Sequence, residues 1–142
     1  MRRRVFATLL ALLLFAPAPA ARAATPPNGV LVEAHKNVTS FHEDLARIDR
    51  ARDALEAEVA RAPSLEGLLL LSWAHLLWAD YRAPGAEAKL ASYERGRDVA
   101  KRAIDLNPKS PEAHLWYAAN LGRWAITRGK LHAAFLLGTL KQ

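Results

Sequence analysis

The five histidines are considered first, because imidazole is the commonest metal ligand and general base in proteins. His42-Glu43 begins the helical zinc-protease motif, in which a second histidine lies four residues after the first. Position 46 is Ala46, so that second ligand is absent. His75 lies in the most apolar part of the chain and is expected to be a hydrogen-bonded core residue. We therefore expect no metal site and no cofactor.

Nucleophilic catalysis finds equally little support. None of the serines lies in the Gly-x-Ser-x-Gly context of a nucleophile elbow. The seven glycines are scattered and form no phosphate-binding loop. The chain has no cysteine, which excludes disulfides, thiolate catalysis and Cys-ligated zinc. We expect the protein not to be an enzyme.

Aromatic residues give the strongest candidate for a binding site. Trp116, Asn120, Arg123 and Trp124 share one face of a predicted helix, because residues three, four and seven apart in a helix lie above one another. An amide and a guanidinium beside two indoles would hold a carboxylate while the rings bury an apolar group. The alternative is that the tryptophans only pack between helices. We take the four residues as a candidate site for a protein, a peptide or a small ligand.

The charge of the chain points away from nucleic acid. The formal net charge is +6, but residues 1–23 hold four arginines and no acid. Without them 16 basic and 14 acidic side chains remain. This excess of basic over acidic groups is too small for a nucleic-acid-binding face. The last thirty residues carry four basic and no acidic side chains, which mildly favours an acidic partner.

Residues 1–23 have the pattern of a secretory signal peptide. Three arginines precede an apolar run over residues 5–16, which is shorter than the roughly 20 residues that span a bilayer. Ala21-Arg22-Ala23 then supplies a small-x-small cleavage site. We predict cleavage after Ala23 and a periplasmic or secreted protein. An uncleaved membrane anchor and export by the twin-arginine route remain open.

The remaining chain predicts an all-α domain over residues 40–142, preceded by a linker over 24–39. Ser40 and Glu43 have the spacing of a capping box and predict a helix that ends near residue 62. Ser64 predicts the start of a second helix. That helix is apolar almost all round, so we expect it to lie at the centre of the domain.

Three more helices complete the prediction. They are expected over about 86–106, 111–128 and 130–140, with Gly129 as the stop between the last two. No alternation of apolar and polar residues is long enough for a strand. The fold class is therefore a short array of about five antiparallel helices.

The third and fourth of these helices carry a repeat pattern. Gly96-x3-Ala100-x2-Ala103-x4-Pro108, followed by Pro111-Glu112-Ala113-His114, resembles the joint between two tetratricopeptide repeats. The register of about 34 residues per repeat places His114, Tyr117, Ala118 and Leu121 at core positions of the following unit. The helix at 111–128 is about one turn longer than a standard repeat has there.

Residues 92–108 and 111–118 are similar to two families with this tetratricopeptide-like fold. One is the bacterial branch of the regulator of microtubule dynamics family, and the other is the T-component of TRAP transporters. The resemblance, over about residues 65–140, implies a non-catalytic interaction protein in the periplasm. Its alternative is a small-ligand-binding accessory component of a TRAP-type transporter.

Such proteins usually continue into a further helix and repeat, whereas this sequence stops at Gln142. The expectation is that the last helix lacks its packing partner. A minimal domain, pairing with another chain, or a longer chain of which this is a part would each explain that.

Overall fold

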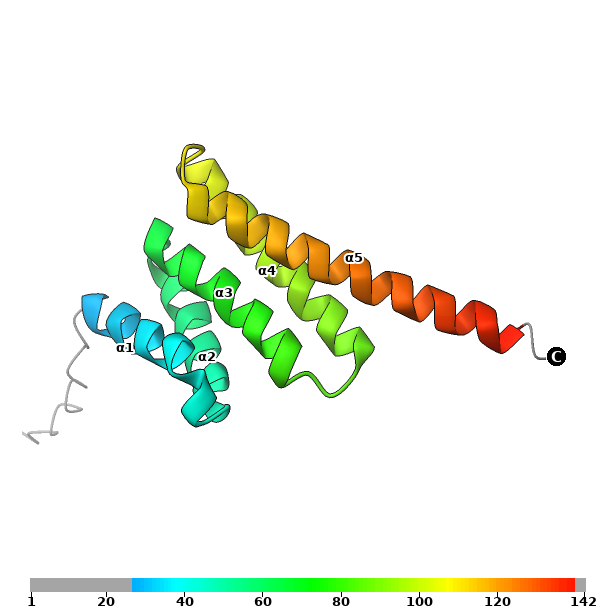
Figure 1. Cartoon of the computed structure of the whole chain (residues 1–142). Helices are drawn as coiled ribbons and strands as arrows, with labels where there is room; N and C mark the ends of the chain where they lie inside the picture. The colour runs from blue at the N-terminus through cyan, green and yellow to red at the C-terminus, as the bar shows by residue number, and fades with distance from the viewer. Residues whose placement is uncertain (1–26, 140–142) are drawn as a thin grey trace, which may run out of the picture.

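The computed structural model describes residues 27–139, with side chains over 29–130. Within these residues the chain forms helices and no strand, which confirms the predicted all-α fold (Figure 1). The predicted signal segment, residues 1–23, lies outside the described residues. The elements are α1 (Pro27–Thr39), a 3-10 turn η1 (Phe41–Glu43), α2 (Ala46–Arg61), α3 (Leu65–Tyr81), α4 (Ala86–Leu106) and α5 (Pro111–Thr139).

The helices form a small array of two layers. In Figure 1, α1, α3 and α5 lie toward the viewer, and α2 and α4 lie behind them. Each helix packs against the next one along the chain, and α3 also packs against both α1 and α5. Within the described residues, α2 and α4 flank α3 without packing backbone to backbone.

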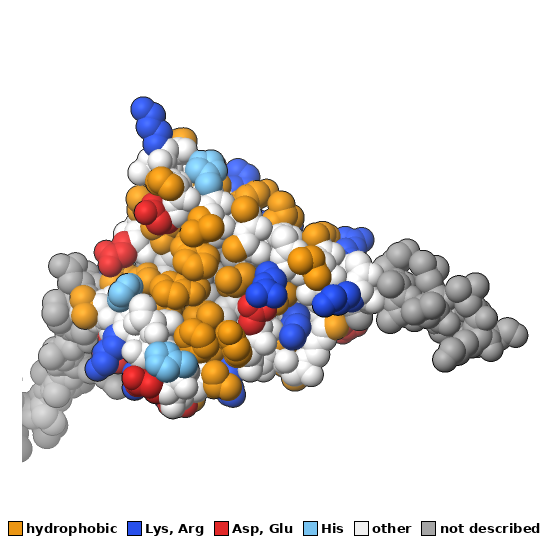
Figure 2. All heavy atoms as spheres, in the orientation of Figure 1, with side chains coloured by type: hydrophobic (Ala, Val, Ile, Leu, Met, Phe, Trp, Pro, Cys, Tyr) orange, Lys and Arg blue, Asp and Glu red, His pale blue; other side chains and the backbone are white. Residues whose placement is uncertain are grey.

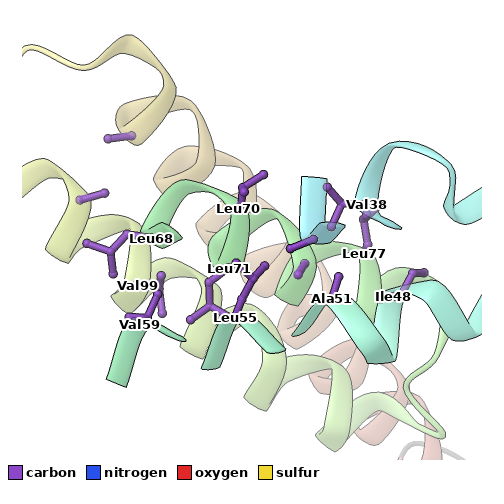
Figure 3. Packing of buried hydrophobic residues seen from close by; sticks show 14 residues of the cluster. Val38, Ile48, Ala51, Leu55, Val59, Leu68, Leu70, Leu71, Leu77 and Val99 are labelled. Atoms are coloured by element: carbon purple, nitrogen blue, oxygen red, sulfur yellow. The ribbon is translucent and has the colours of Figure 1, made fainter. Parts of the chain in front are cut away.

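The core is built around α3, as expected from its apolar composition. Its residues Leu68, Leu71 and Ala74 are almost fully buried. They meet Leu55 of α2 and Val99 of α4 in one continuous cluster (Figure 3). Burying an aliphatic side chain of this size contributes about 1.5–3 kcal/mol. Helix α3 is therefore the common support for the helices on both of its sides.

The predicted linker over residues 24–39 is wrong from residue 27 onward, because that stretch forms α1. Ala34 and Val38, four residues apart, are buried against the core, and Leu31 packs against its edge. Polar residues between them (Glu33, His35 and Lys36 among others) make this apolar stripe narrow. The array consequently begins before residue 40.

The two predicted serine caps have opposite outcomes. Ser64 Oγ accepts a hydrogen bond of 3.1 Å from the Gly67 amide, which confirms it as the N-cap of α3. Ser40 makes no capping bond and precedes only the turn η1. The carboxylate of Asp44 instead accepts from the Ala46 amide at 2.9 Å, and α2 begins there.

Gly129 does not end a helix, as the sequence led us to expect. Helix α5 runs without interruption from Pro111 to Thr139. No glycine among the described residues has a positive φ, so the backbone conformation of a glycine stop is absent there. A glycine inside a helix costs only about 1 kcal/mol relative to alanine, which its helix-forming neighbours offset. Residues 27–139 hold five α-helices, because α1 is added to the prediction and the last two predicted helices form the single helix α5.

Candidate functional site

The predicted site on α5 is only partly accessible, because Asn120 is completely buried. Its Nδ2 donates to the backbone oxygens of Ser72 at 3.3 Å and Trp116 at 3.0 Å. It also donates to Ser72 Oγ at 3.1 Å, and that hydroxyl donates to the Gly96 oxygen at 2.8 Å. The Asn120 amide therefore joins α5 to α3 and α4, and it is not exposed to a partner.

Trp116 takes part in the packing between α5 and α3. Its ring is stacked on that of Trp73, with centroids 5.2 Å apart and planes 15° from parallel. Both indoles are half-buried. Figure 2 shows a band of hydrophobic side chains along the middle of the face that α1, α3 and α5 form.

Arg123 and Trp124 contact different helices. Arg123 has its partner on α3, and Trp124 has its partner on α5 itself. The Arg123 guanidinium lies 3.5 Å from Asp80 of α3, whose carboxylate also accepts from the Tyr93 hydroxyl. The Arg128 guanidinium lies 4.9 Å above the Trp124 ring. The four predicted site residues thus share α5 without converging on one hollow.

His114 was expected at a core position of the repeat, and this is wrong. Its side chain is exposed, and Nε2 lies 2.9 Å from the backbone oxygen of Pro108. It therefore fixes the turn before α5 and does not pack in the core.

A concave feature of the described residues lies elsewhere, between α2 and α4. Two adjoining hollows of about 410 and 400 Å³ share Glu56, His75 and Arg95, and we call them together the α2–α4 groove. Side chains of α3 form its floor, since α2 and α4 do not meet over α3. In Figure 1, the helices α2 and α4 that form its walls lie behind α3.

The first hollow is rich in guanidinium and aromatic groups. The Arg52 guanidinium lies 4.8 Å above the Trp78 ring and is anchored at 2.7 Å by Asp53. Arg95 reaches across from α4 to within 3.5 Å of Glu56 on α2. On α4, the small side chains of Ala88 and Ala91 line the hollow, which leaves room between these charged groups.

His75 lies at the point where the two hollows meet and is only 3% exposed. Burial, followed by the positive charges of Arg52 and Arg95, lowers the pKa of His75 to about 4. The ring is therefore neutral at pH 7 and carries a single proton. This confirms the expected hydrogen-bonded core histidine, since Nδ1 lies 3.3 Å from Ser92 Oγ.

The two ring nitrogens of His75 face different helices. Nδ1 lies 3.3 Å from Ser92 Oγ on α4, and that hydroxyl also lies 2.9 Å from the His75 backbone oxygen. Nε2 lies 3.4 Å from Glu56 Oε1 on α2. With its proton on Nε2, the neutral ring donates to the Glu56 carboxylate and accepts at Nδ1. His75 therefore links α2 and α4 from the floor of the groove.

Among the described residues, no group of three histidine, cysteine or acidic side chains is placed to hold a metal ion.

The second hollow is mainly apolar. Val59 and Ala60 of α2, Leu71 of α3 and Val99 of α4 line it, and Figure 3 shows the two valines beside Leu71. Asp98 and Arg102 lie at its rim. The groove thus has a charged half and an apolar half, which adjoin each other between α2 and α4.

The sequence analysis missed this groove because its walls come from three helices. The available signal was the i, i+4, i+7 spacing of Arg52, Glu56 and Val59 on α2, repeated by Arg95, Val99 and Arg102 on α4. Neither spacing shows which helix lies opposite it. Each alone has the pattern of an ordinary solvent-exposed helix face.

Comparison of the chain with protein families, with curated proteins and with solved structures finds no match. Within residues 27–139, no helix combines the length and the apolar character that crossing a membrane requires. The case for function therefore depends on the geometry of the groove.

Proposed function

We propose that this protein is a non-catalytic interaction module that binds a segment of another protein in the α2–α4 groove. The observation that carries the proposal is the open shape of that groove, with charged rims and an apolar half. A small-ligand accessory of a transporter would be favoured by a closed aromatic pocket. Both hollows are open along their length, which favours an extended partner.

The place of action belongs to the same proposal. The signal-like residues 1–23 and the resemblance to tetratricopeptide-like periplasmic proteins support a partner in the periplasm or outside the cell. Stacked helical hairpins commonly present such surfaces to other proteins. The predicted α5 residues Trp116, Arg123 and Trp124 would then contribute to packing and charge away from the groove.

The test is to fill the groove without disturbing the core. Ala60 lines the second hollow and is exposed, so Ala60→Trp places an indole in it with little effect on folding. Ala57→Trp is the matched control, because Ala57 is exposed on the same helix and does not line either hollow. Each variant carries a photo-cross-linking amino acid at position 91 and is expressed in the source cells.

We expect one or a few cross-linked proteins with the control and their loss with Ala60→Trp. Cross-links that are identical for both variants would contradict the proposal, and so would their absence from both. A cross-linking amino acid at position 118 on α5 serves as a second control, since Ala118 is exposed and lines neither hollow.

A further inference from the structure

Building on the proposed function, we infer which kind of segment the groove binds. The occupant is a peptide segment with an acidic side chain and a large aliphatic side chain about two or three residues apart. Its carboxylate lies between Arg52 and Arg95, and its aliphatic side chain fills the hollow at Val59, Leu71 and Val99. Each contact follows from a separate feature of the groove.

The carboxylate position follows from the two guanidinium groups in the first hollow. Arg95 is 72% exposed at its side chain, and its pair with Glu56 is long at 3.5 Å. Charge-assisted bonds between a guanidinium and a carboxylate are about 2.7–2.9 Å long, so Arg95 has stronger bonds still to make. Arg52 is held in place by Trp78 and Asp53 and presents its charge to the same space.

Glu56 does not block that position. Its contacts with His75 Nε2 and with Arg95 are both long, at 3.4 and 3.5 Å, and its side chain is 41% exposed. An incoming carboxylate can therefore take Arg95 while Glu56 turns toward solvent.

The field at the floor of the groove also favours an anion. Arg52 and Arg95 both act on the buried ring of His75 as positive neighbours and help to lower its pKa. The same potential stabilises a negative charge that enters the hollow beside them. A cationic ligand would meet the opposite effect.

The arrangement of the two hollows favours a peptide over a small acid. The charged hollow and the apolar hollow adjoin each other between α2 and α4, so a ligand that fills both must present an acidic and an aliphatic group some distance apart. A peptide carries both groups as side chains of one backbone.

The spacing follows from helix geometry. Along α2, Arg52 and Val59 are seven residues apart, which corresponds to about 10 Å at 1.5 Å per residue. Along α4, Arg95 and Val99 are four residues apart, or about 6 Å. An extended peptide advances about 3.3 Å per residue, so the acidic and the aliphatic positions differ by about two or three.

The experiment uses a displayed library of random decapeptides, selected on the purified protein with Ala57→Trp and, separately, with Ala60→Trp. Peptides enriched only on the first protein require the open groove. We expect most of these to contain Asp or Glu two or three residues from Leu, Ile, Val or Met. Their synthetic versions should bind at least about tenfold more weakly when the acid is replaced by its amide.

Matched arginine variants test the assignment of the carboxylate. Arg52→Gln/Arg95→Gln should weaken binding of the acidic peptides about tenfold or more and should not affect their amide versions. Arg50→Gln/Arg128→Gln removes the same charge outside the groove and should leave both peptides unchanged. Circular dichroism and thermal unfolding check that each variant is folded.

The outcomes separate the inference from the proposed function. Groove-dependent peptides without an acidic residue, or acidic peptides indifferent to the Arg52 and Arg95 changes, overturn the inference and leave the proposed function standing. If no enriched peptide requires the open groove, and the cross-links in cells do not either, the proposed function fails together with it.

Discussion

Asn120 on α5 lies directly against Gly96 on α4. A Cβ atom added at residue 96 would lie 2.3 Å from Asn120 Oδ1 and 2.6 Å from its Cγ. The absence of a side chain at Gly96 is therefore what allows the Asn120 amide to reach Ser72 on α3. This one close approach sets the spacing of three helices.

Gly96→Ala is expected to destabilise the protein. Asn120 is fully buried and holds three hydrogen bonds, so it cannot move away without breaking some of them. Overpacking of this kind costs about 1–3 kcal/mol. Chemical denaturation monitored by circular dichroism would measure the loss in the free energy of unfolding.

Gly122→Ala is the control for that change. Gly122 also lies within a helix, but a Cβ there meets nothing within 4 Å. Removing a glycine from a helix interior should stabilise the protein by about 0.5–1 kcal/mol. Equal effects of the two substitutions would show that Gly96 is not a packing site.

The two serine positions make a second matched pair. Ser64→Ala removes the bond to the Gly67 amide and should lower the free energy of unfolding by about 1 kcal/mol. Ser40→Ala removes no capping bond and should change it by less than about 0.5 kcal/mol. Thermal and urea unfolding of the two variants checks the difference, and a larger effect at Ser40 would contradict the assigned caps.

His75 predicts how stability depends on pH. Its folded pKa of about 4 lies below the ordinary value of 6.5, so between these values the unfolded chain binds the proton more readily. Stability from this group is complete above about pH 6.5 and falls as the pH drops toward 4, by about 3 kcal/mol in all. Glu56, Ser92, Arg52 and Arg95 are the polar and charged groups that face the ring.

The measurement is the difference in unfolding free energy between the wild type and His75→Leu from pH 7 to pH 4. The wild type should lose more stability than the variant over this range. His114→Leu serves as the control, because His114 is exposed. A pH profile that is parallel for the wild type and His75→Leu would show that folding does not lower the pKa of the ring.

Substitution of Arg123 distinguishes binding at the predicted α5 site from binding in the groove. Its pair with Asp80 is long and exposed, so Arg123→Ala should change stability by less than about 1 kcal/mol. We also expect groove-selected peptides to bind this variant as they bind the wild type. A tenfold loss of their affinity, measured by calorimetry, would move the binding site to α5.

The fold class could be predicted because strong local signals agree with the packing. The apolar sequence of α3 and the cap at Ser64 each determine local structure that the tertiary contacts keep. The helix α1 was missed because its apolar stripe is narrow and becomes significant only when α2 and α3 cover it. The predicted helix end at Gly129 was wrong because a glycine stop requires a positive φ, which this residue does not adopt.

The candidate site was harder to predict, since it depends on contacts between helices. The face of Trp116, Asn120, Arg123 and Trp124 exists, but sequence periodicity does not show which residues of a face point inward. Asn120 is buried because Gly96 opens a space for it on another helix. The groove likewise arises from the separation of α2 and α4, a property of neither sequence segment alone.

The pattern of packing has a consequence for how the chain folds. Among residues 27–139, every contact between α-helices joins helices that are one or two places apart in the chain, so the array has low contact order. Proteins of this kind close short loops only and fold in microseconds to milliseconds. Helices α1–α3 can form one partial array and helices α3–α5 another. Helix α3 belongs to both partial arrays.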